Sequence, residues 1–336
     1  MKRITAVGSL NVDLVVRAPR APEAGETVAG ESLTRYPGGK GGNQAAAAAR
    51  LCRREDAAPD LASAAASDPI AVSLIGRVGN DGEGEFLLGR LAGAGVDTSG
   101  VGRDDDHGTG IAAITVAATT GENRIVLIAG ANEALTPGVL GQHHDVLTAA
   151  DVLLLQLEIP LPTVQTAARM GREKRAIVIL DPAPARPLPA ALLRLCDFVT
   201  PNRGELALLV RAAAPSRADL SEDDAPDLAA VATQAHALAA LGARHVVVKL
   251  GRHGVLICTP QGDHHVPGFA VTAVDTTAAG DTWNGAFAVA LCEGRPLREA
   301  ARFANAAAAL SVTRKGAQAS IPTRAEVDAL LASQGG

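Results

Sequence analysis

One acidic residue stands where a short extended segment passes into a helix whose first residues are small. The stretch reads Asp275-Thr-Thr-Ala-Ala-Gly-Asp281-Thr-Trp-Asn-Gly285, and Val271–Val274 end the extended segment before it. Free backbone N–H groups and the positive end of the helix dipole make such a helix start a site for anions. A carboxylate there would repel a phosphate, so proton abstraction from an attacking hydroxyl is the chemistry that suits Asp281. An ordinary capping Asp is the alternative, and the stretch alone leaves both open.

Polar side chains also follow two apolar runs that have the character of buried strands. Asn11 and Asp13 come after Ile4–Val7, and Glu158 ends the run Val152–Leu157. Residues two apart share one face of an extended segment, and ligands of α/β sheets bind past the carboxyl ends of strands. These residues therefore indicate a ligand site, with a simple polar turn as the alternative.

A glycine-rich stretch, Pro37–Gln44, leads into an alanine-rich helix expected over Ala45–Leu51. It is not a Walker A loop, because no Gly-Lys-Ser/Thr occurs at the required spacing. Its backbone N–H groups, together with Lys40 and Asn43, could still surround a polar ligand. A merely flexible turn is the alternative.

Asn202 and Glu205 lie three apart at an expected strand-to-helix turn. Oxygen ligands placed there could order the water shell of Mg²⁺ bound to a phosphate. A capping arrangement of the helix start is at least as good an explanation in isolation.

Strands and helices alternate after about Ile70, which predicts a mostly parallel sheet with helices on both faces. One of these strands is expected at Ile70–Ile75, before a turn at Gly76–Gly84. The segments Leu14–Arg17 and Glu26–Thr34 alternate in hydrophobicity and carry few large apolar residues, which indicates a separate small sheet that could act as a lid. Two β-rich runs, Gly108–Ala118 and Arg124–Ala129, flank a turn and predict a hairpin that can supply the remaining strands of this sheet.

Composition limits the function classes. The 336 residues are 47% hydrophobic and carry a net charge of −5, so the chain can bury a sizeable core and has no basic footprint for nucleic acid. Its four cysteines form no C-x-x-C pair, which predicts free thiols in a reducing compartment, and no H-E-x-x-H or other metal cluster is evident. The N-terminal apolar run is too short for a signal peptide and no window predicts a membrane span. A cytoplasmic protein is expected.

Taken together, these motifs resemble those of the ribokinase (PfkB) family of carbohydrate kinases, nearly from end to end. Any one motif is moderately specific, but all of them in order are strongly specific. The stretches that carry the resemblance are Gly8–Asp13, Gly38–Gln44, Gln156–Glu158, Asp181–Arg186, Thr200–Asn202, Asp275–Gly285 and Val312–Gln318.

The resemblance implies a role for each matching residue. Asp281 is expected to be the general base, and backbone N–H groups of Ala278, Ala279 and Gly280 an anion hole for the transferring phosphoryl group. The residues expected to bind D-ribose are Asn11, Asp13, Gly39, Lys40, Gly41, Asn43, Glu158 and Asp281. Those expected to bind ATP are Asn202, Lys249, Leu250, Gly251, Arg252, His253, Gly254, Gly280, Asp281 and Asn305.

Two cations follow from the same resemblance. Mg²⁺ is expected to enter with ATP beside Glu205, and K⁺ to act as a monovalent activator bound largely by backbone carbonyls. The K⁺ positions are Asp275, Thr277, Ser311, Arg314, Gly316 and Ser320. Two departures from the family pattern stand out. Asn305 occupies a position where histidine is common, and the loops Arg53–Pro69 and Ala212–Pro226 are long enough to be surface insertions.

The implied whole is a single ribokinase-like kinase domain over residues 1–336, with a three-layer α/β/α core and lid strands at about 14–36 and 108–129. The implied reaction is ATP-dependent phosphorylation of D-ribose at its 5-hydroxyl, which gives D-ribose 5-phosphate and ADP. Family members often pair their lids, so a homodimer is expected. Another acceptor such as deoxyribose is one alternative. A non-catalytic sugar-binding regulator is a second, against which the intact Asp281 argues.

Overall fold

The computed structural model describes residues 1–53, 70–120, 122–211 and 225–334. The two expected insertions, Arg53–Pro69 and Ala212–Pro226, therefore lie almost wholly outside the described residues. Among the helices of the described ranges, none combines the length and the apolar character that a bilayer crossing needs.

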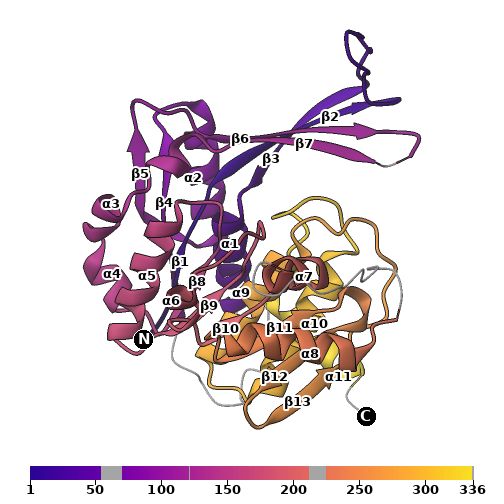
Figure 1. Cartoon of the computed structure of the whole chain (residues 1–336). Coiled ribbons are helices and arrows are strands. Elements are labelled where there is room, and N and C mark those ends of the chain that lie inside the picture. Colours follow the sequence, from indigo (N-terminus) through magenta and orange to yellow (C-terminus); the bar gives the residue numbers. More distant parts are fainter. Residues whose placement is uncertain (54–69, 121, 212–224, 335–336) are drawn as a thin grey trace.

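The main sheet has nine strands in the order β13-β12-β11-β10-β9-β8-β1-β4-β5 (Figure 1). Neighbours from β5 to β11 run parallel, and only β12 and β13 at one edge are antiparallel. The mostly parallel sheet predicted from the sequence is thus confirmed. The strands are β1 Lys2–Val7, β4 Ile70–Gly79, β5 Asp97–Asp104, β8 Val152–Leu155, β9 Ile177–Leu180, β10 Phe198–Val199, β11 His245–Lys249, β12 Val255–Thr259 and β13 Gly262–Val266.

Helices cover both faces of this sheet, because successive residues of its central strands enter two different cores. Leu154 of β8 packs into one apolar cluster, whereas Leu153 and Leu155 pack into the other. Both faces of a parallel strand must therefore be apolar, as the run Val152–Leu155 is. Helices of the first cluster are α1 Lys40–Cys52, α2 Gly82–Ala94, α9 Ala279–Cys292, α10 Leu297–Ser311 and α11 Arg324–Ser333. Those of the second are α3 Pro137–Gly141, α4 His144–Thr148, α5 Leu161–Glu173, α6 Ala190–Leu193, α7 Arg203–Arg211 and α8 Leu228–Ala240.

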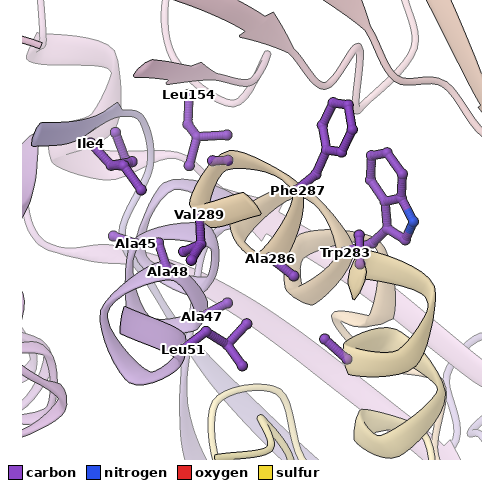
Figure 2. Packing of buried hydrophobic residues seen from close by; sticks show 14 of the residues in the cluster. Ile4, Ala45, Ala47, Ala48, Leu51, Leu154, Trp283, Ala286, Phe287 and Val289 are labelled. Carbon is purple, nitrogen blue, oxygen red and sulfur yellow. The ribbon is translucent and has the colours of Figure 1, made fainter. Parts of the chain in front are cut away.

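The helices α1 and α9 pack unusually closely, and small residues make this possible. Figure 2 shows Ala45, Ala47 and Ala48 of α1 near Ala286 and Val289 of α9, with every one of these side chains buried. A methyl group placed on the α9 residue 285, a glycine, would lie 2.7 Å from an α1 backbone oxygen, so no larger residue fits. This close crossing brings the first turns of the two helices together.

A second sheet of four strands, in the order β3-β2-β6-β7, extends away from the main sheet at one end of the molecule (Figure 1). Its outer pairs are antiparallel and its central pair, β2 with β6, is parallel. The separate small sheet expected from the sequence is confirmed as a feature of the fold. Its strands are β2 Asn11–Ala18, β3 Ser32–Gly38, β6 Gly110–Ala117 and β7 Asn123–Ile128.

Several element boundaries differ from those the sequence predicts. The strand expected at Glu26–Thr34 is β3, which begins at Ser32, and the strand expected to end at Ile75 continues to Gly79. Val271–Val274 is irregular and exposed rather than extended in a sheet. The strand β5 and the hairpin β12–β13 were not predicted, because β5 contains glycine and aspartate and the hairpin is short.

The largest shift concerns α1, which begins at Lys40 rather than Ala45. The glycines at 41 and 42 are therefore helical, not part of a turn. Their lack of a side chain serves close packing: a methyl group on Gly41 would lie 2.6 Å from the backbone of Gly8. Asn43 and Gln44 consequently project from the first turn of a helix, which orients them rigidly.

Candidate active site

Asp281 lies in the first turn of α9 and is only 6% exposed. The side-chain amides of Asn43 and Gln44 donate to its two oxygens, each at 3.0 Å. Burial raises the pKa of Asp281, the positive charge of Lys40 lowers it, and the negative charge of Asp181 raises it again; the result lies above the usual value. A carboxylate so held is more basic than a free one and points in one direction.

The start of α9 also offers unpaired backbone donors. Ala278 caps the helix with φ of 56°, the left-handed region, and Ala279 donates its N–H to a carbonyl three residues earlier at 3.2 Å. Within the described residues, the N–H groups of Gly280 and Asp281 donate to no acceptor. Nζ of Lys249 would lie 3.3 Å from a methyl group placed on Gly280. Two N–H groups, a helix dipole and an ammonium thus converge on one point, which favours an anion.

Glu158 accepts hydrogen bonds from polar groups near the end of β1. Its Oε2 accepts from the hydroxyl of Ser9 at 2.6 Å, from the backbone N–H of Lys40 at 3.1 Å and from the amide of Asn11 at 3.5 Å. The sequence predicts Asn11, Lys40 and Glu158 as parts of one sugar site, and the fold brings them into contact. Because β1 and β8 are adjacent and parallel, their carboxyl ends lie side by side.

Asp13 is charged and yet unpaired. Among the described residues its carboxylate accepts no hydrogen bond, and it lies so close to Gly38 that a methyl group there would meet its Cγ at 2.5 Å. Burial, then the negative charges of Glu158 and Asp281, raise the pKa of Asp13 to about 7. Such a carboxylate lacks the donors that would stabilise its charge, and the hydroxyls of a polyol ligand could supply them.

The pKa of Lys40 is also affected by nearby carboxylates. Burial alone lowers the pKa of its ammonium, but the carboxylates of Asp281, Asp181, Glu158 and Glu205 raise it above the usual value. Lys40 therefore stays charged. The carboxylates that act on it include the expected sugar ligand Glu158 and the expected Mg²⁺ ligand Glu205.

Asn202 and Glu205 form a reciprocal pair at the start of α7. The backbone N–H of Asn202 donates to Oε2 of Glu205 at 2.8 Å, and the N–H of Glu205 donates to Oδ1 of Asn202 at 2.7 Å. This is the capping arrangement that the sequence left open as an alternative. Within the part of the chain that the structure describes, the second oxygen of Glu205 has no hydrogen-bond partner, and burial raises the pKa of that carboxyl group.

The segment after β11 closes into a tight loop. The N–H of Leu250 donates to the carbonyl of Gly254 at 2.8 Å, and Gly251 and Gly254 have φ of 57° and 85°, which glycine adopts without strain. The side chain of Leu250 is buried, so only its backbone can face a nucleotide. Arg252 is exposed and His253 partly so, at the tip of the loop.

The side chain of Asn305 forms hydrogen bonds to neighbouring protein groups. Its Oδ1 accepts from the indole N–H of Trp283 at 2.8 Å, and its Nδ2 donates to the carbonyls of Val266 and Pro267, each at 3.0 Å. The side chain is 5% exposed. It thus ties α9, α10 and the end of β13 together, and all its hydrogen-bonding capacity towards these neighbours is in use.

The residues expected to bind K⁺ come from two loops that the structure joins through Asp275. One carboxylate oxygen accepts from the N–H and hydroxyl of Thr277 at 2.9 and 2.6 Å, and the other accepts from the N–H of Gly316 at 2.8 Å. These bonds hold the pKa of Asp275 below its usual value although burial opposes them. The N–H of Asp275 also donates to the carbonyl of Val312 at 3.1 Å.

The side chains of three other residues expected to bind K⁺ are engaged with protein groups. The hydroxyl of Ser311 donates to the carbonyl of residue 308, and that of Ser320 to the carbonyl of residue 317. The guanidinium of Arg314 pairs with Glu326. If these residues hold a cation, they do so through backbone carbonyls, as the sequence analysis expects.

Sequence reasoning assigned no role to Gln44, Gln156, Asp181 or Asn132. Gln44 donates to both Asp181 and Asp281, and Asn132 donates to Oδ1 of Asn11 at 2.8 Å. Gln44 and Asp181 lay inside quoted motifs, so their polar character within buried runs was the available signal. For Asn132, in the 3₁₀ turn 130–134, no sequence signal pointed to the site.

One group of possible metal ligands lies away from this site. His236, Cys258 and Asp263 bring their ligand atoms within 4.8 Å of one another. No sequence spacing revealed this group, because α8, β12 and β13 each contribute one residue. Burial, with the charge of Asp263, raises the pKa of Cys258 to about 12, and His236 lies 3.0 Å from Asp263. The four cysteines are free, as predicted.

Comparisons with known proteins agree with this geometry. Residues 1–324 match the family described as pfkB family carbohydrate kinase. The chain is 38% identical over 325 residues to the ribokinase of Haemophilus influenzae, covering 97% of each chain. Its fold matches the ribokinase of Thermotoga maritima with a TM-score of 0.85 at 37% identity, covering 99% of this chain and 100% of that one. It also matches Arabidopsis thaliana ribokinase complexed with ribose and ATP, with a TM-score of 0.85 at 32% identity, covering 98% and 99%.

Proposed function

The chain belongs to the pfkB family of carbohydrate kinases, and from this membership we propose that it transfers the γ-phosphoryl group of ATP to the 5-hydroxyl of D-ribose. The products are D-ribose 5-phosphate and ADP. One observation carries the proposal: a buried carboxylate, Asp281, lies in the same helical turn as two backbone N–H groups that have no acceptor among the described residues. Base and anion site are thereby fixed relative to each other, as an in-line transfer requires.

Asp281 is the general base. A carboxylate has a pKa of about 4 in water and cannot ionise an alcohol in the ground state. It can accept the proton as the new O–P bond forms, and the raised pKa of Asp281 makes it a better acceptor. The amides of Asn43 and Gln44 occupy one lone pair on each oxygen and hold the carboxylate plane still.

The anion site stabilises the charge that the phosphoryl group carries in the transition state. The N–H groups of Gly280 and Asp281, the dipole of α9 and the ammonium of Lys249 supply fixed positive potential. The ammonium of Lys40 adds a mobile charge between sugar and phosphate. We assign the remaining nucleotide contacts to Asn202, the loop 249–254 and the neighbourhood of Asn305.

D-Ribose is held by Asn11, Asp13, Asn43 and Glu158 together with the backbone of residues 39–41. Glu158 is already organised by three donors, whereas Asp13 has none and gains them when sugar hydroxyls bind. Hydroxyl-to-carboxylate bonds reject analogues that lack the hydroxyl more strongly than apolar contacts could.

Mg²⁺ suits the residues present. Glu205 has a carboxylate oxygen that no described residue occupies, and carboxylate oxygen with water is the donor set that Mg²⁺ prefers. Mg²⁺ bound with ATP supplies charge neutralisation of the phosphates. The protein's part is to fix Glu205 through its reciprocal pair with Asn202.

K⁺ suits the two loops joined at Asp275. Hydrogen bonds of Asp275 to Thr277 and Gly316 hold the two loops together next to the anion site, since residue 277 directly precedes Ala278. Backbone carbonyls and the Asp275 carboxylate would supply the oxygen donors. A monovalent cation there supplies structural order to the α9 start. We propose as its holders Asp275, Thr277, Ser311, Arg314, Gly316 and Ser320, mostly through backbone oxygens.

We further propose that residues 1–336 act as one kinase domain in which the small sheet is a lid over the sugar, and that two lids pair in a homodimer. The edge strand β7 exposes about half of each of its four apolar side chains: 57% for Ile125, 65% for Val126, 47% for Leu127 and 54% for Ile128. Alternate residues face opposite sides of a strand, so both faces of β7 are apolar. One face suits the closed sugar site and the other a second copy.

The dimer can be tested by light scattering after size exclusion. Val126 and Ile128 share one face and Ile125 and Leu127 the other, so each pair is changed to serine separately. One pair should yield monomers, and the other should raise the KM for sugar without changing the mass. A wild-type chain that runs as a monomer at micromolar concentration contradicts the pairing.

The proposed reaction is tested by ADP release from MgATP with D-ribose, 2-deoxyribose, fructose and adenosine, each with K⁺ and with Na⁺. Ribose should give the highest kcat/KM. Preference for another acceptor would keep the mechanism and reassign the substrate. Ribose binding without turnover of any acceptor would favour a non-catalytic regulator and overturn the proposal.

A further inference from the structure

A row of hydrogen-bonded buried side chains runs from Asp281 to Lys249. Nε2 of Gln44 donates to Oδ1 of Asp281 and to Oδ2 of Asp181, both at 3.0 Å. Oδ1 of Asp181 then accepts from Nζ of Lys249 at 2.9 Å. Gln44 is 0% and Asp181 2% exposed. The row connects the general base to the ammonium at the anion site through two residues that otherwise have no role.

The amide of Gln44 has only one workable orientation. Its two N–H bonds go to the two carboxylates, and its Oε1 accepts from Nε2 of Gln156 at 2.6 Å. A flipped amide would set its oxygen against Asp181 and Asp281 and its nitrogen against another donor. Asp181 therefore helps to fix the group that holds Oδ1 of Asp281.

Asp181 has the same effect on Lys249. The lysine side chain is 13% exposed and the aspartate side chain 3%, so their pairing takes place largely out of water. In the described part of the chain, Lys249 has no second ion-pair partner. A long lysine stem needs such an anchor to keep its ammonium at a defined point beside Gly280.

We propose that Asp181 is a positioning residue that aligns the two working parts of the site, the base Asp281 through Gln44 and the phosphate-facing Lys249 directly. The proposal rests on the kinase function above. Asp181 is not among the residues assigned to the sugar or the nucleotide, and we expect it to act through its two neighbours, Gln44 and Lys249. Its negative charge also cancels the positive charge of Lys249, so the net charge of the pair is zero.

The negative charge of Asp181 acts on the pKa of Asp281 in a known direction. Burial is the largest influence that raises the pKa of Asp281; Lys40 lowers it and Asp181 raises it. Asp13, which is also close to Asp281, stays unchanged in the experiment. Removing the charge of Asp181 should therefore make Asp281 ionise at lower pH. A purely structural Asp181 would affect stability but would not move this ionisation.

The test uses the full chain with Asp181→Asn, Lys249→Met and the double variant. Asparagine keeps the shape of aspartate but brings its own N–H₂ group, so it can accept from Gln44 or from Lys249 but not from both. Each single variant leaves one buried charge without its partner, and the double variant removes both charges. Melting temperature, KM for sugar and for MgATP, and kcat from pH 5 to pH 9 are measured for all three.

For Asp181→Asn we expect kcat to fall, the acid limb of the kcat profile to move to lower pH, and KM for sugar to stay within about twofold, since no sugar contact changes. For Lys249→Met we expect a raised KM for MgATP. The double variant should melt above both single variants, and its loss of kcat should be smaller than the product of the single losses.

An unmoved acid limb in Asp181→Asn, or losses that simply multiply in the double variant, would overturn the proposal. If Asp181→Asn does not fold, the double variant still decides, because a neutral pair should restore folding. The matched control is the buried pair Arg324–Glu293 at the far end of α9, with side chains 5% and 7% exposed. Arg324→Met should lower the melting temperature and leave the pH profile unchanged.

Failure of the Asp181 proposal can be distinguished from failure of the proposed function. All comparisons are ratios to the wild-type chain with whichever sugar it phosphorylates best, so a substrate other than D-ribose does not affect them. Absence of turnover with every acceptor would remove the proposed function, and the coupling of Asp181 with Lys249 would then be judged by melting temperature alone. Additive effects on melting temperature would overturn the pairing in that case too.

Discussion

Asp13→Asn should make the ligand-free protein more stable while abolishing tight sugar binding. The pKa of Asp13 is raised from 3.8 to about 7, first by burial and then by Glu158 and Asp281. A folded pKa above the unfolded value means that stability is fully present below pH 3.8 and is lost as pH rises through about 7. A difference of about 3 in pKa corresponds to about 4 kcal/mol at pH 8. Because the side chain is still partly solvent-accessible, about half of this, about 2 kcal/mol, is the expected gain.

Thermal unfolding of the ligand-free chain measures this gain. At pH 8 the variant should melt above the wild-type chain by about 4 to 8 °C, given about 2–4 °C per kcal/mol for domains of about 150–250 residues. The gain should shrink steadily towards pH 5, where Asp13 is protonated in the folded protein. The exposed Asp145→Asn on α4 is the control and should change neither curve. A variant that is no more stable at pH 8, or a gain independent of pH, would refute the reasoning.

Three further outcomes follow from the site. Asp281→Asn should lower kcat by about 10² to 10⁴-fold, as loss of a general base does, and leave ribose affinity measurable by calorimetry; near-normal turnover would remove Asp281 as the base. K⁺ should raise kcat above its value in Na⁺ or Tris at equal ionic strength, and Asp275→Asn should weaken that response; equal rates in all three buffers would contradict the cation assignment. Asn305→Ala should lower the free energy of unfolding by about 1–3 kcal/mol. The indole N–H of Trp283 and two backbone carbonyls would then be buried without their hydrogen-bond partner. If only the KM for MgATP rises, Asn305 is a direct nucleotide ligand instead.

The sequence predicts this site well wherever a polar residue ends an apolar strand. Asn11 and Glu158 could be placed together because β1 and β8 are recognisable as buried strands, and parallel strands end at a common edge. Asp281 could be placed at a helix start because small residues precede it. These inferences use only local pattern and the general geometry of α/β folds, so they survive errors of a few residues in the element boundaries.

The rest depends on contacts between distant segments, which local pattern does not encode. The glycines before Asn43 look like a turn, but the close approach of Gly41 to Gly8 makes them the first turn of a helix. Asp181 could be noticed as a polar residue after a buried run, but its role could not be assigned, because it depends on the partners that the fold brings to it, Gln44 and Lys249. Asn305 was expected at the nucleotide, yet its hydrogen bonds are spent on holding α9 to the end of β13.

The charges of the site explain why it should bind its substrates together with cations. Besides burial, the negative charges of Glu158 and Asp281 raise the pKa of Asp13, and that of Asp181 raises the pKa of Asp281. Burial lowers the pKa of the Lys40 ammonium, but the carboxylates of Asp281, Asp181, Glu158 and Glu205 raise it above its usual value. Such a site repels the phosphates of ATP unless positive charge arrives with the nucleotide or is already fixed nearby. Mg²⁺ can supply the first, and the α9 dipole and the proposed K⁺ the second. Burial raises the pKa of Asp281 most; Lys40 lowers it and the negative charge of Asp181 raises it again. Burial among anionic groups, which raises the pKa of Asp13 and weakens the empty fold, therefore also prepares Asp281 to take a proton.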